Sequence, residues 1–356
     1  MSIDQYTFPI TKTSESKIKY FDWDHLDFGK NFSDHMFLME YEDGAWSQGE
    51  IVPFADLTMH PAMSAIHYGQ SIFEGLKANR TENGEVSIFR PDMNAKRFNE
   101  SAERMCMPTI PEDLFVEAIR QLVSLDTEWV TSREGHSLYI RPFMFATDEL
   151  VGIRPSRTYK FLIITTPVGQ YYSEPVNVKI EKSYTRAASG GVGRAKAAGN
   201  YAASMYPALQ AQKEGYHQLV WTDAAEHKYI EESGTMNIIF QIGDKLITPD
   251  ENHDTILRGI TKRSVIEVAE MWGVEVEERM ITIKEVIEAA KNGTLKDAFG
   301  AGTAATIAPI AMIGYEDEKF MLPPVKDRLI SNKIKKFLGD LKTGRVEDTF
   351  GWNFIV

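Results

Sequence analysis

The residue with the clearest potential for covalent chemistry is Lys196, which lies in the glycine- and alanine-rich run GGVGRAKAAG (190–199). Because glycine and alanine carry little bulk, another group can approach the lysine amine closely. Arg194 lies two positions earlier, and a neighbouring cation disfavours the ammonium form and helps to free the amine. A phosphate-binding P-loop requires GxxxxGK[ST], and Ala195 and Ala197 around this lysine do not match it. A flexible glycine loop with a solvated lysine is the alternative interpretation.

A carboxylate follows this lysine along the chain. Asn200 opens a predicted helix that ends near Gly215, and two apolar strands come next, HQLVW and TMNIIF. Glu232 lies just before the second strand, in ESGTMN. An imine-forming lysine, an acidic partner for the ring nitrogen and a phosphate cup are what pyridoxal phosphate requires of a protein. Lys196 and Glu232 can supply the first two.

A phosphate cup needs backbone N–H groups at the start of a helix, together with hydroxyls or a cation. The segment Gly259-Ile260-Thr261 precedes a predicted helix and can offer such groups. Thr303 follows a glycine and adds a hydroxyl, and Arg97 adds a charge. Taken singly, Arg97 also fits a solvated helix arginine and Thr303 an ordinary turn residue, so the joint pattern carries the prediction.

Composition limits the class of protein. The chain has 356 residues, enough for two domains, and its 43% hydrophobic and 25% charged residues are ordinary for a globular protein. The net charge of −12 argues against a broad polyanion-binding face, so no nucleic-acid partner is expected. No segment reaches transmembrane length and the N-terminus resembles no signal peptide, so we expect a cytoplasmic protein without membrane association. Cys106, between two methionines, is expected to be buried.

Turn and helix signals place the candidate residues of the first half. Hairpins are predicted at the Asp43-Gly44 and Asn83-Gly84 turns. Asp92 is predicted to cap a helix that contains Arg97. Tyr139 and Arg141 lie two residues apart in the predicted strand SLYIRPFMF, so both side chains should point to the same face of a sheet.

In the second half, Thr282 and Glu285 predict a capping box. The segment DAFGAGTAATIAPI predicts a strand broken by Gly300 and Gly302. Hairpin pairs mixed with separate helices favour an α+β fold over a βαβ series. We expect a small N-terminal domain over 1–167, an interdomain loop over 168–177 and a larger cofactor-binding domain over 178–356.

Several motifs together resemble one family almost end to end. They are FGKNFSDHMF, HYGQSIFEGLKA, SLYIRP, GGVGRAKAAGNY, ESGTMN, ILRGIT, FGAGTA and GWNFIV, in that order. They are similar to the branched-chain amino acid aminotransferases, which are fold-type IV pyridoxal-phosphate enzymes. The resemblance implies a two-domain α+β fold with a small N-terminal α/β domain, a larger domain with a curved mixed sheet, and the cofactor between them.

The resemblance also implies residue roles. Lys196 would bind the cofactor as a Schiff base and shuttle the proton, Glu232 would pair with the pyridine nitrogen, and Tyr201 would bind the phenolic oxygen. Implied for cofactor binding are Arg97, Lys196, Tyr201, Glu232, Thr235, Ile260, Thr261 and Thr303. Implied for substrate binding are Phe28, Tyr68, Phe73, Tyr139, Arg141, Ile153, Tyr171, Thr235 and Ala304. Phe28, Phe73 and Tyr68 also fit ordinary core aromatics.

The reaction implied is reversible transamination of L-leucine, L-isoleucine and L-valine with 2-oxoglutarate, which gives branched-chain 2-oxo acids and L-glutamate. Since Ile153 corresponds to a residue inserted by a partner subunit, the resemblance implies at least a homodimer. Two relatives of the same fold are alternatives, a D-amino acid aminotransferase and an aminodeoxychorismate lyase. A cofactor-binding protein without turnover is a remote alternative.

Overall fold

The computed structural model describes residues 6–170, 172 and 174–356. Its internal contacts divide the chain into two compact units. The first consists of Met1–Tyr171, Ala195–Ala198 and Asp340–Val356, and the second of Tyr172–Arg194 and Gly199–Gly339. The contacts thus assign Lys196 to the first unit and Glu232 to the second. The domain division at 1–167, 168–177 and 178–356 stays a prediction.

The first unit is built on a sheet whose named strands all pair antiparallel, in the order β19-β6-β5-β7-β8-β1-β2, with β3 added on β1 and β4 on β7. Both predicted hairpins are confirmed, since β1 and β2 meet at Asp43-Gly44 and β5 and β6 enclose Asn83-Gly84. The elements are η2 (Lys17–Tyr20), β1 (His35–Glu42), β2 (Ala45–Trp46), β3 (Glu50–Pro53), α1 (Ser64–Tyr68), β4 (Ser71–Phe73), β5 (Leu76–Arg80), β6 (Val86–Phe89), α2 (Pro91–Arg104), α3 (Glu112–Leu125), η3 (Thr127–Trp129), β7 (Ser137–Ala146), β8 (Tyr159–Val168) and β19 (Asn353–Ile355).

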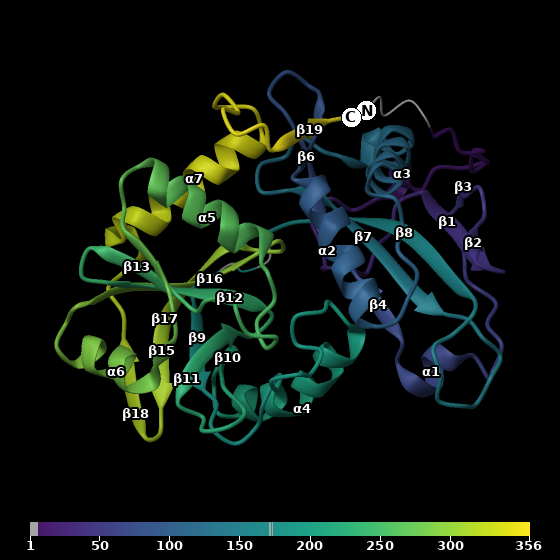
Figure 1. The fold of residues 1–356 in the computed structure, drawn as a ribbon. Helices are drawn as coiled ribbons and strands as arrows, with labels where there is room; N and C mark the ends of the chain where they lie inside the picture. Colours follow the sequence, from purple (N-terminus) through teal and green to yellow (C-terminus); the bar gives the residue numbers. More distant parts are fainter. Residues whose placement is uncertain (1–5, 171, 173) are drawn as a thin grey trace. The chain divides into compact units, whose positions relative to one another are not determined.

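Strand alternation gives this sheet two apolar faces. On β1, Phe37 and Met39 join the core formed with α2 and α3, whereas Met36 packs with Met63 and Leu162 in a second cluster. Successive side chains of a strand point to opposite faces, so a strand with apolar residues at both registers must be covered on both sides. Figure 1 shows α2 and α3 beside the strands that they cover.

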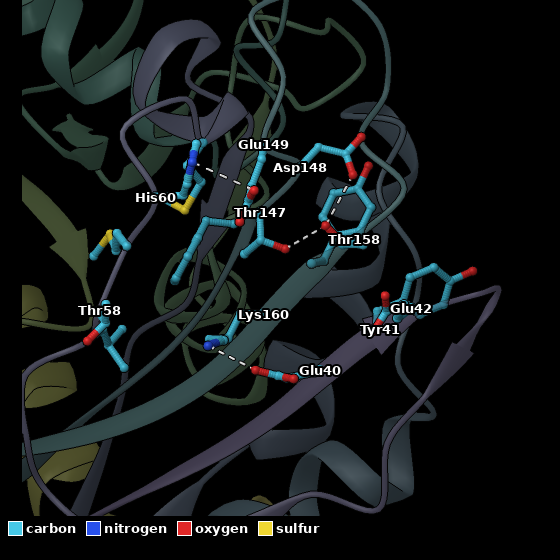
Figure 2. A pocket seen from close by; sticks show the side chains of 15 residues that line it. Glu40, Tyr41, Glu42, Thr58, His60, Thr147, Asp148, Glu149, Thr158 and Lys160 are labelled. Carbon is cyan, nitrogen blue, oxygen red and sulfur yellow. Dashed lines mark hydrogen bonds and ion pairs between the residues drawn. The ribbon is translucent and has the colours of Figure 1, made fainter.

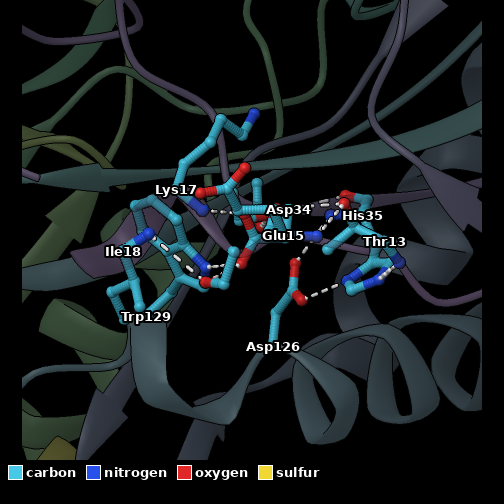
Figure 3. A network of polar contacts seen from close by, with 11 residues as sticks. Thr13, Glu15, Lys17, Ile18, Asp34, His35, Asp126 and Trp129 are labelled. Atoms are coloured by element: carbon cyan, nitrogen blue, oxygen red, sulfur yellow. Dashed lines mark hydrogen bonds and ion pairs between the residues drawn. The ribbon is translucent and has the colours of Figure 1, made fainter. Parts of the chain in front are cut away.

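The N-terminal segment is attached to the first unit by a buried polar network (Figure 3). The backbone N–H of Thr13 donates to His35 Nε2 at 3.0 Å, which leaves Nδ1 to donate to Asp126 Oδ1 at 2.6 Å. Asp34 accepts from the Ser16 hydroxyl, the Lys17 N–H and the Trp129 indole. Burial raises the pKa of Asp34, but these three donors outweigh it and hold the pKa below its usual range.

The second unit contains a mixed sheet in the order β14-β13-β12-β16-β17-β9-β10-β11-β15, with β18 added on β17. Parallel pairs, β9 with β10 and β17 and β13 with β14, stand among antiparallel ones. This arrangement agrees with the predicted α+β class and with the predicted mixed sheet. The elements are β9 (Val176–Ile180), α4 (Ala198–Lys213), β10 (Gln218–Thr222), β11 (Tyr229–Ser233), β12 (Met236–Ile242), β13 (Lys245–Thr248), α5 (Ile260–Met271), β14 (Val276–Glu278), β15 (Ile281–Thr282), α6 (Ile283–Lys291), β16 (Leu295–Gly302), β17 (Thr306–Tyr315), β18 (Glu318–Met321), η4 (Val325–Asp327) and α7 (Leu329–Lys342).

Three local predictions were wrong. Helix α2 begins at Pro91 after Arg90, so Asp92 lies inside the first turn and does not cap the helix. Gly300 does not interrupt its strand, since β16 runs through it. A Cβ at Gly300 would lie 2.6 Å from Cε of Met236, so glycine allows that side chain to pack against the strand. Cys106, which follows the end of α2 with a φ of 54°, is exposed.

The predicted capping box of α6 was confirmed in part. The Thr282 hydroxyl accepts the Glu285 N–H at 3.1 Å and caps α6, although the Glu285 carboxylate binds Arg279 and does not close the capping box. In the described part of the chain, no helix is both long and apolar enough to cross a membrane.

Candidate active site

Lys196 is fixed to the first unit through its backbone. Its carbonyl accepts the Phe73 N–H at 3.1 Å, and its own N–H donates to the Ser101 hydroxyl of α2 at 2.9 Å. The next residue, Ala197, forms a β-bridge with Ile72 of β4. The lysine ammonium lies 4.7 Å from the centre of the Phe73 ring. The lysine is therefore held at the edge of β4, with its half-buried side chain over an aromatic face.

Arg97 is buried, so the alternative of a solvated helix arginine was wrong. It forms a two-point ion pair with Glu74, with Nε to Oε1 at 2.7 Å and Nη2 to Oε2 at 2.8 Å. Asn94 and the Gly75 N–H also donate to this carboxylate. Burial raises the pKa of Glu74, but the Arg97 charge and its hydrogen bonds, with the nearby Lys196 charge, hold it below the usual range.

Four of the predicted substrate-binding residues of this unit form one contiguous group. Tyr139 and Arg141 share a face of β7, as the two-residue spacing predicted, and Arg141 Nη2 donates to the Tyr139 hydroxyl at 3.0 Å. The Arg141 guanidinium lies 4.5 Å from the centre of the Phe73 ring, and the Phe28 ring lies edge-on to Tyr139 at 5.1 Å. Phe73 thus contacts both Arg141 and the predicted Schiff-base lysine.

Gly75 explains why Tyr139 fits this group. A Cβ at Gly75 would lie 2.1 Å from the Tyr139 hydroxyl oxygen, so only glycine admits the phenol there. Two further predicted residues are exposed. Tyr68, at the end of α1, is 42% exposed and Ile153 is 91% exposed, while Tyr171 lies outside the described residues.

Glu232 lies in β11, a strand that the sequence analysis did not predict. It is 4% exposed, and its Oε1 accepts the Leu257 N–H at 2.8 Å and the Asn237 amide at 3.3 Å. Its Oε2 lies 2.9 Å from Nε of Arg186, an ion pair. A buried carboxylate with this set of donors is stabilised in its ionised form. It can accept a hydrogen bond from a protonated pyridine nitrogen.

The start of α5 suits an anion. Gly259 occupies the N-cap, no side chain caps the helix, and the first turn carries no acidic residue. The N–H groups at a helix start lack intrahelical partners and attract negative charge, so Ile260 and Thr261 can offer theirs to a phosphate. Gly259 is required, because a Cβ there would lie 1.7 Å from the Asn237 amide oxygen.

Strand register aligns these features within the second unit. Glu232 on β11 pairs with Asn237 on β12, and Asn237 pairs with Ala301 on β16. Thr303 and Ala304 lie just beyond Ala301, in the turn from β16 to β17. Thr235 lies exposed in the β11–β12 turn, and Tyr201 is half-buried in α4. Figure 1 shows these strands side by side.

Sequence reasoning missed the residues that support this chemistry. Glu74, Gly75 and Ser101 fix Arg97, Tyr139 and Lys196, and Arg186 and Asn237 fix Glu232. Gly75, in the sequence FEGL, was a usable signal, because a glycine allows another group to approach the backbone closely. Arg186 and Ser101 carried none, since each meets its partner only through the fold.

A separate pocket of about 390 Å³ lies in the first unit, and it contains no predicted site residue (Figure 2). On its lining, Lys160 forms an ion pair with Glu40 at 2.9 Å, and His60 Nε2 lies 3.7 Å from a Glu149 carboxylate oxygen. Among the residues that the structure describes, no cluster of His, Cys, Asp or Glu has the makeup of a metal site.

Comparisons with known proteins identify the family. The family model for amino-transferase class IV matches residues 71–313. Branched-chain-amino-acid aminotransferase 2 of Bacillus subtilis (strain 168) is 45% identical over 350 residues, which cover 97% of this chain and 96% of that protein. These figures far exceed what a shared fold alone requires, and they favour the branched-chain assignment over the D-amino acid and lyase alternatives.

Solved structures agree with this assignment. The branched-chain amino acid aminotransferase of Escherichia coli has a TM-score of 0.73 and 26% identity in one crystal structure, and the match covers 89% of this chain and 98% of that one. A second branched-chain amino acid aminotransferase, solved with pyridoxamine 5′-phosphate, has a TM-score of 0.71 and 26% identity, covering 89% and 97%. The chain belongs to the class IV aminotransferases and, within that family, to the branched-chain-amino-acid aminotransferases.

Proposed function

We propose that this protein uses pyridoxal 5′-phosphate to exchange amino groups between L-leucine, L-isoleucine or L-valine and 2-oxoglutarate. The proposal covers the reverse reaction with L-glutamate and branched-chain 2-oxo acids. The observation that carries it is the 45% identity to a branched-chain aminotransferase along almost the whole chain. One structural relative in this family is solved with pyridoxamine 5′-phosphate, the amine form of the same cofactor.

The residues present fit this cofactor. Lys196 supplies the amine, Glu232 a buried carboxylate for the ring nitrogen, and Tyr201 a phenol for the cofactor's ring oxygen. The phosphate would be held by the Ile260 and Thr261 N–H groups, the Thr303 hydroxyl and Arg97, with Thr235 as a further polar contact. The α5 start, without an acidic residue or a side-chain cap, supports the phosphate assignment.

When bound, the cofactor supplies an electron sink that stabilises negative charge at the substrate α-carbon. Lys196 then moves a proton between that carbon and C4′ of the cofactor, as a general base followed by a general acid. Phe73 limits the directions that the amine can take, since the ammonium lies over its ring. Ser101 and Phe73 hold the lysine backbone in place, so any movement of the amine comes from its side chain.

Substrate selection is assigned to the Phe73 group. Phe28, Phe73 and Tyr139 offer apolar ring surface for a branched side chain, and Ala304 is also assigned to substrate binding. Arg141 and Tyr68 are assigned to the side-chain carboxylate of glutamate, since a guanidinium binds carboxylates in two-point geometry. Extra methylenes in an apolar pocket are worth about 1–3 kcal/mol each, so discrimination among the three branched substrates is expected to be modest.

Assembly and location complete the proposal. Ile153, with 91% of its surface exposed, is an unusual position for an isoleucine, which supports insertion into a partner subunit of at least a homodimer. Tyr171 is assigned to the interdomain loop. The proposed compartment is the cytoplasm.

An absorbance titration of the purified protein tests the function. With pyridoxal phosphate the wild type should show a visible band that disappears on addition of L-leucine and returns with 2-oxoglutarate. Lys196→Ala should show neither change. A band that responds to a D-amino acid and not to L-leucine would assign the protein to the D-specific relatives. Release of pyruvate from aminodeoxychorismate would instead indicate the lyase.

A further inference from the structure

Arg186 is a buried arginine to which the proposed chemistry gives no role. It lies in the segment that follows β9, and only 9% of its side chain is exposed. Its Nε lies 2.9 Å from Glu232 Oε2, and its Nη2 donates to the carbonyls of Thr255 and Gly193. One guanidinium therefore joins β11, the segment before α5 and the glycine run before Lys196.

Tight packing fixes this arrangement within the second unit. A Cβ at Gly193 would lie 2.4 Å from the Ala187 Cβ and 2.9 Å from the Asp254 carbonyl oxygen. The glycine run thus lies directly on the segment that contains Asp254 and Thr255. Gly193 is needed for this contact, which gives one of the glycines before Lys196 a specific structural reason.

The same segment is tied to Glu232 at a second point. Leu257 donates its N–H to Glu232 Oε1, and its carbonyl accepts the Asn237 amide at 2.9 Å. Two residues later, Gly259 caps α5 against the Asn237 side chain. The carboxylate and the helix start are therefore connected by a short chain segment whose two ends contact Arg186 and Asn237.

Arg186 is also the cation beside two buried carboxylates. Glu231 and Glu232 are 7% and 4% exposed. Burial raises the pKa of Glu231, while Arg186 and the Thr255 hydroxyl oppose that rise. A buried carboxylate that loses its cation is driven toward the protonated form. A protonated Glu232 would no longer supply the negative charge that keeps a pyridine nitrogen protonated.

We infer that Arg186 is a positioning residue for the cofactor: it keeps Glu232 ionised and aimed, and it ties that carboxylate to the segment leading into the phosphate-binding start of α5. The inference rests on the proposed function, because it assigns Glu232 to the ring nitrogen. Loss of Arg186 should therefore weaken cofactor binding and also change how the bound cofactor titrates with pH.

The experiment compares Arg186→Gln and Arg186→Lys with the wild type, using protein stripped of cofactor and titrated with pyridoxal phosphate. Arg186→Gln should bind roughly 10- to 100-fold more weakly, because it removes the cation that lies 2.9 Å from Glu232 Oε2. The pH midpoint of its visible band should also move. Arg186→Lys retains the positive charge but loses the separate contacts of Nε and Nη2. Its affinity for pyridoxal phosphate should therefore fall, while its pH midpoint stays close to the wild-type value.

Arg263→Gln is the matched control, since it removes an exposed arginine of α5 that pairs with Glu267. It should leave both readouts unchanged. A purely structural role for Arg186 would lower the melting temperature without moving the pH midpoint, and that result overturns the inference. Wild-type affinity and an unchanged midpoint in Arg186→Gln would do the same. If that variant does not fold, Arg186→Lys decides, because wild-type affinity in it contradicts the positioning role.

The two proposals fail differently. A wild type that gains no visible band with pyridoxal phosphate refutes the cofactor and, with it, the role of Arg186. A wild type that gains the band, together with an Arg186→Gln variant that gains it at the same concentrations, overturns only the inference about Arg186.

Discussion

Replacing Glu74 with glutamine should destabilise the first unit by about 3–5 kcal/mol, the usual effect of removing one partner from a buried ion pair. Glu74 is fully buried and accepts both Arg97 bonds, the Asn94 amide and the Gly75 N–H. Glutamine presents an NH₂ group where one of those donors points and removes the charge opposite Arg97. Two lost bonds to a charged group, at about 1.5–3 kcal/mol each, give a similar total.

Thermal unfolding of the cofactor-free protein measures this effect without a contribution from ligand binding. For a domain of about 150–250 residues, each kcal/mol lowers the melting temperature by about 2–4 °C, so a fall of about 6–20 °C is expected. The control is Glu82→Gln, which breaks the exposed pair with Arg345 and should cost about 1 kcal/mol or less. A Glu74→Gln melting temperature within the range of that control would refute the reasoning.

The pH dependence supplies an independent check. The pKa of Glu74 is held below its usual range in the folded protein, so the ionised pair stabilises the fold above the unfolded pKa of about 4.3. That contribution is lost as the pH falls below this value. The stability difference between wild type and Glu74→Gln should therefore be full at pH 6–7 and shrink on acidification below about pH 4. A difference that stayed constant would show that the charge is not the cause.

Three further predictions concern other parts of the molecule. Gly75→Ala should displace the Tyr139 phenol and lower kcat/KM for L-leucine roughly 100-fold, while the visible cofactor band persists. The control is Gly339→Ala, where an added Cβ meets nothing within 4 Å; it should leave both kcat/KM and the cofactor band unchanged. Burial and the nearby Lys77 charge lower the pKa of Lys342 to about 7, so its charging destabilises the fold below that pH and the urea midpoint should rise as the pH increases from 7 to about 10. Lys342→Met should reduce this slope and leave the part due to Lys77, whose pKa burial lowers to about 8; an unchanged slope would contradict the assignment. Thr282→Ala should lose the α6 cap and about 1 kcal/mol, seen as a melting point about 2–4 °C lower; no shift would show that Thr282 does not stabilise α6.

Local sequence signals determined where several helices and strands lie and where turns separate them. The Asp43-Gly44 and Asn83-Gly84 hairpins follow from residues adjacent in the chain, as does the helix that starts after Gly259. The shared face of Tyr139 and Arg141 follows from strand geometry alone. The family motifs, which extend over nearly the whole chain, determined the class of reaction without any information on the tertiary structure.

Only the tertiary structure decided which groups meet. Glu74 and Arg97 lie far apart in the sequence, and so do Arg186 and Glu232. No local sequence pattern therefore predicts either ion pair. The exposure of Cys106 was mispredicted, because burial depends on what a distant segment places over a residue. Sequence sets short-range conformational preference, whereas partners far apart in the chain are fixed only when sheet register and close packing bring them together.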